Sequence, residues 1–128
     1  MKPRRSVPTD LELELLKVVW ARGQATVREV FQDLSEQRKI AYTTVLTMMG
    51  ILEQKGHLKK TAGARAYIYR PAQPKDQVVG GMVEEFVNRV FSGSAKPLLV
   101  HLVEDPTIPT EDLAEIEKRL RARRKKQP

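Results

Sequence analysis

Three threonines, Thr43, Thr44 and Thr47, lie close together at a spacing that matters for recognition. At 100° per residue, Thr43 and Thr47 fall on one side of a helix and Thr44 flanks them, whereas Val45 and Leu52 fall on the other side. A threonine hydroxyl donates and accepts hydrogen bonds, and its methyl group can contact a thymine methyl. The pattern is typical of a helix that reads base edges or phosphates, with helix-surface filler or local capping as the alternative.

The same predicted helix, residues 41–55, carries further candidates for contact with nucleic acid. Leu46 and Ile51 can meet thymine methyl groups. Tyr42 either reaches a phosphate through its hydroxyl or packs against the preceding helix. Gly50 either lets a nucleic-acid strand approach the backbone closely or permits tight helix packing.

Basic side chains surround this segment. Lys55 ends the predicted helix, Lys60 and Arg65 follow it, and Arg28 lies near the start of an earlier helix. All four suit the neutralisation of phosphates, and we expect them to position a duplex rather than to read its sequence. Lys59 is also a candidate for phosphate neutralisation, and the alternative is that its side chain is simply solvated at the surface.

Two helices are predicted ahead of the threonine-bearing segment. Thr9 precedes Glu12 by three residues, the spacing of a capping box, in which a hydroxyl and a carboxylate satisfy free amides at a helix start. Thr26 and Glu29 repeat this spacing. Because apolar residues recur at helical intervals after each box, we expect one helix over residues 9–22 and a short amphipathic helix from Thr26.

Two short strands are predicted after the third helix, over residues 58–61 and 66–70. Gly63 is expected to give the turn between them its conformational freedom. A two-stranded hairpin is marginal alone, so at least one tyrosine of the second strand should pack on the helices. Three helices followed by a basic hairpin are the layout of a winged helix-turn-helix domain, which we expect over residues 9–72.

Residues 73–122 predict a helical dimerisation domain. Their apolar stripes are too wide to be buried on one slim subunit, so two copies are expected to interlock. The residues expected at that interface are Val79, Met82, Val83, Phe86, Val90, Phe91, Leu98, Leu99, Leu102, Leu113, Ile116 and Leu120. His101 is expected to be a buried, hydrogen-bonded core residue rather than a metal ligand or pH sensor.

The two ends of the chain are basic. Residues 1–8 form a proline-containing N-terminal arm, and residues 123–128 form a tail rich in Lys and Arg. The tail either adds non-specific affinity for DNA or is a solvated terminus. The fold class expected for the whole chain is mainly α with a small β-hairpin.

The composition narrows the function further. The 128 residues carry 23 Lys and Arg against 16 Asp and Glu, and the resulting charge of +7 favours a polyanion such as nucleic acid or an anionic membrane surface. With no cysteine and two histidines, no metal or other cofactor is expected. No secretory signal and no stretch of roughly 20 apolar residues appears, which predicts a cytoplasmic protein without membrane insertion. No catalytic constellation or phosphate-binding fingerprint is found, so an enzyme is not expected.

One ordered set of residues resembles a known family. The set consists of Leu15-Leu16, Val19-Trp20, Tyr42 to Val45, Thr47, Leu52, Lys55-Gly56, Tyr67, Tyr69 and Pro71. It resembles the bacterial penicillinase repressor family, which includes beta-lactamase, methicillin-resistance and copper-responsive repressors, over roughly residues 7–122. The resemblance implies that the third helix enters the major groove and that the hairpin contacts the DNA backbone. It also implies a dimer that represses its promoter until proteolysis or metal binding releases it.

Several departures from that family refine the expectation. The copper-responsive branch carries cysteine pairs, so its mode of metal sensing is excluded here. The bond that matches the staphylococcal cleavage site lies between His101 and Leu102, and a membrane sensor and protease system is the partner that this would imply. Leu46 and Ile51 stand where those repressors have basic residues, so a different operator is expected.

These observations predict a sequence-specific transcriptional repressor that binds double-stranded DNA. As a homodimer it would recognise a palindromic operator, with half-sites about one helical turn (~34 Å) apart. The alternative is a winged-helix module that binds protein or RNA without operator specificity.

Overall fold

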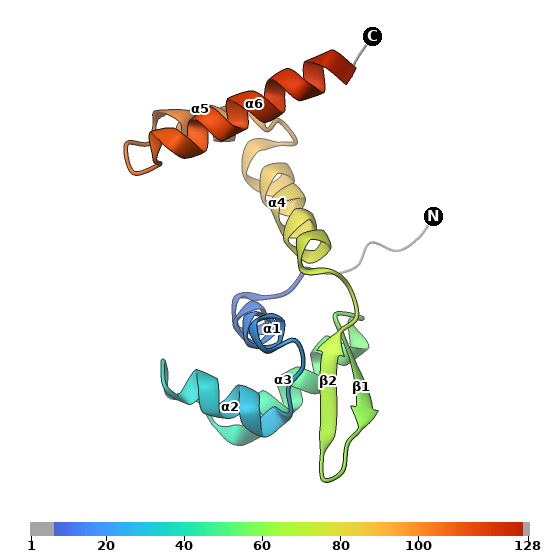
Figure 1. The fold of residues 1–128 in the computed structure, drawn as a ribbon. Helices are drawn as coiled ribbons and strands as arrows, with labels where there is room; N and C mark the ends of the chain where they lie inside the picture. The colour runs from blue at the N-terminus through green and yellow to red at the C-terminus, as the bar shows by residue number, and fades with distance from the viewer. Residues whose placement is uncertain (1–6, 127–128) are drawn as a thin grey trace. The chain divides into compact units, whose positions relative to one another are not determined.

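The computed structural model describes residues 7–126, and over this range the chain is mainly helical with one β-hairpin, which confirms the expected fold class. Residues 1–6 of the predicted N-terminal arm and residues 127–128 of the predicted tail lie outside the described residues. The elements in chain order are α1 (Asp10–Arg22), α2 (Val27–Ser35), α3 (Tyr42–Gln54), β1 (Leu58–Ala62), β2 (Tyr67–Pro71), α4 (Lys75–Phe91), α5 (Lys96–Glu104) and α6 (Thr110–Lys126) (Figure 1).

Both predicted capping boxes are present. At the start of α1, the amide of Glu12 donates to Oγ1 of Thr9 at 3.3 Å and the amide of Thr9 donates to Oε1 of Glu12 at 3.1 Å. At the start of α2, Thr26 and Glu29 form the same pair of bonds at 3.2 and 2.9 Å. These bonds satisfy amides that have no partner within the helix, which is why the two starts could be predicted from local sequence.

The main hydrophobic core lies where α1, α2 and α3 pack together. Leu15, Val30 and Met49, one from each helix, are fully buried in it. Val78 near the start of α4 is buried in the same cluster. The chain divides into compact units after Glu85, further along than the domain boundary expected after residue 72, because the first turns of α4 pack on this core.

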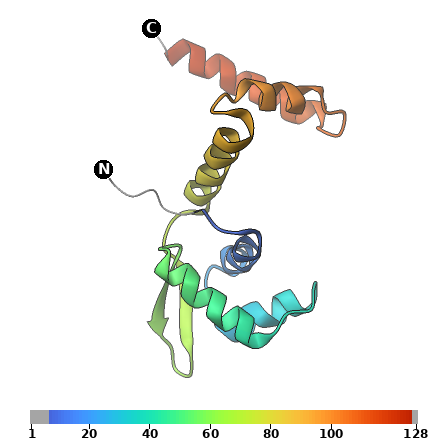
Figure 2. The same cartoon turned by 180° about the vertical axis from the view of Figure 1, so that it is seen from behind.

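The hairpin is attached to the helices through its second strand. β1 and β2 pair antiparallel, with Lys60 opposite Tyr69. Tyr69 is buried, and its backbone exchanges hydrogen bonds of 2.8 and 3.0 Å with Ala25 in the connection between α1 and α2. The expected tyrosine contact is therefore confirmed for Tyr69, whereas Tyr67 is exposed. Seen from behind, the hairpin lies beside α3 (Figure 2).

The turn of the hairpin needs glycine for a different reason from the one predicted. Gly63 does not have a positive φ. Its amide donates to the carbonyl oxygen of Ala66 at 2.9 Å, and a Cβ at Gly63 would lie 2.5 Å from that oxygen. Close approach of the two backbone segments, rather than conformational freedom, therefore excludes a side chain here.

The second unit begins at Phe86 and contains α5 and α6, neither of which has a buried side chain in the single chain. His101 is exposed on α5, so the expectation of a buried histidine is wrong for one subunit, in which no residue of that helix is fully buried. α6 continues to Lys126, so the described part of the predicted basic tail is helical. Among residues 7–126, no helix has the length and apolar character needed to cross a membrane.

Candidate nucleic-acid interface

α3 has one buried side and one exposed side, as the threonine spacing predicts. Val45, Met49 and Leu52 are fully buried against the other helices. The candidate contact residues on the outer side are exposed, and they are Thr43, Thr44, Leu46 and Thr47. The fold thus presents hydroxyl and methyl groups to the outside on a helix whose position is fixed by the core.

Gly50 and Ile51 lie half-buried at the edge of this outer side. A Cβ added to Gly50 would meet nothing within 4 Å. Tight packing inside the chain therefore does not explain the glycine, and that alternative is wrong. Helix propensity does not explain the residue either, because glycine is unfavourable within a helix.

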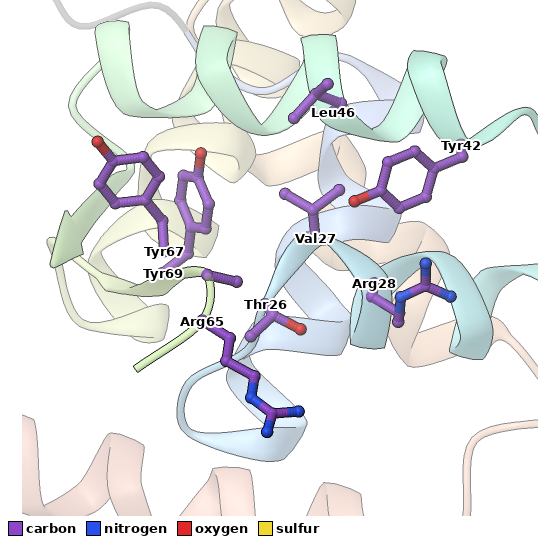
Figure 3. Close-up of a pocket in the computed structure, with 9 residues that line it drawn as sticks. Thr26, Val27, Arg28, Tyr42, Leu46, Arg65, Tyr67 and Tyr69 are labelled. Carbon is purple, nitrogen blue, oxygen red and sulfur yellow. The ribbon is translucent and has the colours of Figure 1, made fainter. Parts of the chain in front are cut away.

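A groove of about 600 Å³ lies between the start of α2, the outer side of α3 and the hairpin (Figure 3). Two guanidinium groups contribute to it, from Arg28 on α2 and from Arg65 in the hairpin turn. The full lining is Thr26, Val27, Arg28, Tyr42, Leu46, Arg65, Ala66, Tyr67 and Tyr69. The groove combines cations with apolar walls, which suits a sugar-phosphate strand.

Tyr42 packs against α2, which is one of the two roles weighed for it. Its ring meets the ring of Phe31 edge to face, with centroids 5.5 Å apart. The guanidinium carbon of Arg28 lies 5.8 Å from the centroid of the Tyr42 ring. Tyr42 thereby holds Arg28 beside the groove, and this cation–π contact leaves the donors of Arg28 available to an anion.

Lys55 has a different role in this structure from the phosphate contact expected of it. Its Nζ donates to Oε1 of Glu12 at 2.7 Å, and the two side chains are 24% and 5% exposed. Burial of Glu12 raises the pKa of its carboxyl, but the hydrogen bonds from Lys55 and from the amide of Thr9 outweigh that effect and leave the pKa below its ordinary value of 4.5. The ammonium is thus committed within the domain.

The cations of the hairpin differ in how far they are engaged. Lys60 lies 4.5 Å from the centre of the Tyr67 ring and 3.7 Å from Oε1 of Glu53. Arg65 and Lys59 are exposed, and within the described part of the chain neither has an ion pair. The hairpin therefore offers unpaired positive charge at its turn and on its first strand.

The predicted dimerisation residues mostly remain uncovered in one subunit. Val83 and Val90 of α4 are each 50% exposed, and Leu99 of α5 and Ile116 of α6 are each 58% exposed. Val79, Phe86, Leu102 and Leu120 are also exposed, whereas Met82, Phe91, Leu98 and Leu113 are half-buried. The bond between His101 and Leu102 lies inside the helix α5.

Thr26 and Tyr67 line the groove but were not among the predicted contacts. The sequence predicts Thr26 as a helix cap, and Tyr67 as a strand residue that could pack on the helices. Their positions in the sequence are the signal that could have identified them. Thr26 precedes Arg28 at a helix start, and Tyr67 follows the turn that carries Arg65. Within residues 7–126, no three His, Asp or Glu side chains gather closely enough to hold a metal ion.

A buried helical core, an outward-facing third helix and a basic hairpin beside it define a winged helix-turn-helix protein. The sequence profile of the family described as Penicillinase repressor matches residues 8–122. The chain therefore belongs to the penicillinase repressor family, a family of DNA-binding transcriptional repressors, and not to a class of enzymes.

Individual relatives agree with this assignment. The chain is 38% identical over 97 residues to the transcriptional regulator BlaI of Mycobacterium tuberculosis, which is 74% of this chain and 70% of the relative. It is 26% identical over 108 residues, 84% of each chain, to the penicillinase repressor of Bacillus licheniformis.

Two solved structures resemble the N-terminal part of the fold. One is the solution structure of monomeric Bacillus licheniformis BlaI in complex with the blaP half-operator, with a TM-score of 0.51 and 29% identity over 57% of this chain and 89% of that one. The other is the DNA-binding domain of the repressor BlaI, with a TM-score of 0.51 and 31% identity over 59% of this chain and 90% of that one. Both support a winged helix in the first unit.

Proposed function

We propose that this protein is a homodimeric transcriptional repressor that binds a palindromic operator in double-stranded DNA. The observation that carries the proposal is the outer side of α3, where Thr43, Thr44 and Thr47 are exposed on a helix anchored by its buried side. A helix of this kind fits the major groove, where hydroxyl and methyl groups can distinguish base pairs. One of the solved structures similar to this chain, monomeric Bacillus licheniformis BlaI, is a complex with a half-operator, which supports the same partner.

Double-stranded DNA accounts for the surface better than RNA does. Readers of single-stranded RNA stack unpaired bases on exposed aromatic rings. Here Tyr42 packs against Phe31, and Tyr67 carries Lys60 over its ring. Each ring therefore already contacts a side chain of the protein, and the exposed threonine hydroxyl groups of α3 and the guanidinium of Arg65 suit the base edges and phosphates of a duplex.

The dimer is supported by apolar surface that one subunit leaves uncovered. Exposed valine, leucine and isoleucine side chains recur on α4, α5 and α6. Burying them against a second copy would gain roughly 25 cal/mol per Å² of apolar surface. A twofold dimer presents two reading helices, and palindromic half-sites about one turn (~34 Å) apart match that symmetry.

Fluorescence anisotropy with duplexes selected from a random-sequence library tests the proposal. We expect the selected sequences to contain inverted repeats, and binding to fall roughly a hundredfold or more when salt is raised from low to moderate concentration. Thr47→Glu should weaken binding to the selected duplex roughly tenfold or more, because it places a negative charge on the reading side of α3.

Ala114→Glu is the matched control for charge. Ala114 is exposed on α6, so the substitution adds the same negative charge in the second unit. It should leave affinity and dimer mass unchanged. Enrichment of no common sequence, or equal affinity of the Thr47→Glu variant and the parent protein, would refute operator recognition by α3.

A further inference from the structure

The turn of the hairpin is narrow and carries a single long side chain. β1 ends at Ala62 and β2 begins at Tyr67. Of the four residues between them, Gly63, Ala64 and Ala66 have nothing beyond Cβ, so Arg65 alone extends from the turn. The 2.9 Å hydrogen bond from the amide of Gly63 to the carbonyl oxygen of Ala66 keeps the turn tight.

Arg65 also differs from Arg70 and Lys60 of the hairpin strands in its contacts with other side chains. Arg70 donates to Oε1 of Gln24 at 2.9 Å and to Oγ1 of Thr61 at 3.1 Å, and Lys60 lies over the ring of Tyr67. The guanidinium of Arg65 is exposed and makes no hydrogen bond or ion pair within residues 7–126. Its five donors are therefore available to an external acceptor.

The groove beside α3 relates the turn to a duplex. Leu46 on α3 and Arg65 in the turn lie on opposite walls of that groove, and Arg28 contributes from α2 (Figure 3). In a complex with α3 in a major groove, we expect the backbone strand that borders that groove to run between the helix and the hairpin, where Arg28 and Arg65 contribute cations. The minor groove would lie beyond that strand, on the side of the hairpin turn that carries Arg65.

We propose that Arg65 inserts into the minor groove next to each half-site and confers a preference for A·T-rich sequence there. The proposal rests on the proposed function and gives Arg65 a reading role instead of phosphate neutralisation. The minor groove is about 6 Å wide, too narrow for a hairpin but wide enough for one guanidinium presented by a turn of small residues. A-tracts narrow this groove further and deepen its negative potential, which attracts arginine.

Flanking base pairs with altered minor-groove chemistry test the proposal. The selected core is placed between flanks of A·T pairs, G·C pairs or inosine·C pairs, and affinity is measured by anisotropy with the full-length protein. Inosine lacks the 2-amino group that guanine places in the minor groove, but has the same major-groove edge. We expect the A·T and inosine·C flanks to bind about fivefold or more tightly than the G·C flank.

Substitutions of Arg65 test whether its side chain causes the preference between flanks. Arg65→Ala should bind all three flanks equally, and Arg65→Lys should lose most of the preference while keeping the charge, because an ammonium is more strongly hydrated. Lys59→Ala is the matched control: Lys59 is exposed on β1, and its loss should weaken binding to every flank by the same factor.

Two results would overturn the assignment of Arg65. One is an inosine·C flank that behaves like G·C, which would place the readout in the major groove. The other is an Arg65→Ala variant that is weaker by one factor on all flanks, as a phosphate contact would be. Either leaves operator binding itself intact, whereas a parent protein that selects no sequence at all would refute the proposed function together with this inference.

Discussion

Lys55 joins the end of α3 to the start of α1 through Glu12. Oε1 of Glu12 accepts two hydrogen bonds, one of 2.7 Å from the ammonium of Lys55 and one of 3.1 Å from the amide of Thr9. One carboxylate therefore completes the first turn of α1 and fixes the C-cap of α3. Because both side chains are largely shielded from water, salt screens this pair less than a surface pair.

Replacing Glu12 by Gln should lower the free energy of unfolding by about 1–3 kcal/mol, because Lys55 loses its charged partner while the amide side chain keeps the cap. Urea denaturation measures this change. Glu14→Gln is the control, since Glu14 pairs with Arg38 on the surface and its loss should cost at most about 1 kcal/mol. Equal destabilisation by the two variants would contradict a special role for Glu12.

Glu12 also predicts how stability depends on pH. Its folded-state pKa lies below the ordinary value of 4.5, so the unfolded chain binds a proton more readily than the folded chain. The stabilisation is present above about pH 4.5 and is lost as the pH falls through the folded pKa. Urea denaturation between about pH 6 and 3 should show a steeper loss for the parent protein than for Glu12→Gln. Parallel curves would exclude this carboxyl as the source.

Substitutions of Tyr42 separate its ring from its hydroxyl. The ring packs on Phe31 and holds Arg28, so Tyr42→Phe should retain stability and DNA affinity within about threefold, whereas Tyr42→Ala should lose about 1–2 kcal/mol of stability and also affinity. Urea denaturation and anisotropy provide the two measurements. If Tyr42→Phe loses as much affinity as Tyr42→Ala, the hydroxyl contacts DNA directly.

Two truncations test where the reading unit ends. A fragment that stops at Glu85 retains Val78 in the core and should be a folded monomer by analytical ultracentrifugation, whereas we expect the full chain to sediment as a dimer. A fragment that stops at Pro74 loses Val78 and should be less stable by about 1–2 kcal/mol. A dimer of the Glu85 fragment would show that the residues beyond Glu85 are not needed for the interface.

Gly50→Ala should separate folding from binding. A Cβ at this position meets nothing within 4 Å, so the substitution should raise the free energy of unfolding by about 0.5–1 kcal/mol through helix propensity. It should nevertheless weaken DNA binding, because the methyl group blocks close approach to α3. Gly80→Ala, with equally open space in α4, is the control that should gain stability without losing affinity. Unchanged affinity of Gly50→Ala would remove the backbone of α3 from the contact surface.

Local signals explain how much of the fold could be predicted. The capping boxes that begin at Thr9 and Thr26 each span only four consecutive residues at a helix start. The buried and exposed sides of α3 likewise follow from the spacing of its own apolar residues. The role of Lys55 could not be predicted in this way, because its partner lies 43 residues away. The packing reason for Gly63 likewise depends on where Ala66 places its carbonyl oxygen.

The candidate site was less predictable than the fold for the same reason. Periodicity identifies which residues of α3 face outward, but it does not show that Tyr67 and Thr26 share a groove with Arg28. Periodicity also does not show that the apolar residues around His101 stay unburied within one subunit. Those facts depend on contacts between segments far apart in the chain.

The asymmetry of α3 has a consequence for how such repressors diversify. Its N-cap residue makes no side-chain cap hydrogen bond and its first turn has no acidic residue, so burial against the core, together with the pair of Lys55 and Glu12 at its end, holds the helix in place. Thr43, Thr44 and Thr47 contribute nothing to that burial. Mutations there can accumulate without threatening folding, so descendants of one ancestral scaffold are free to acquire new target sites while their architecture stays constant.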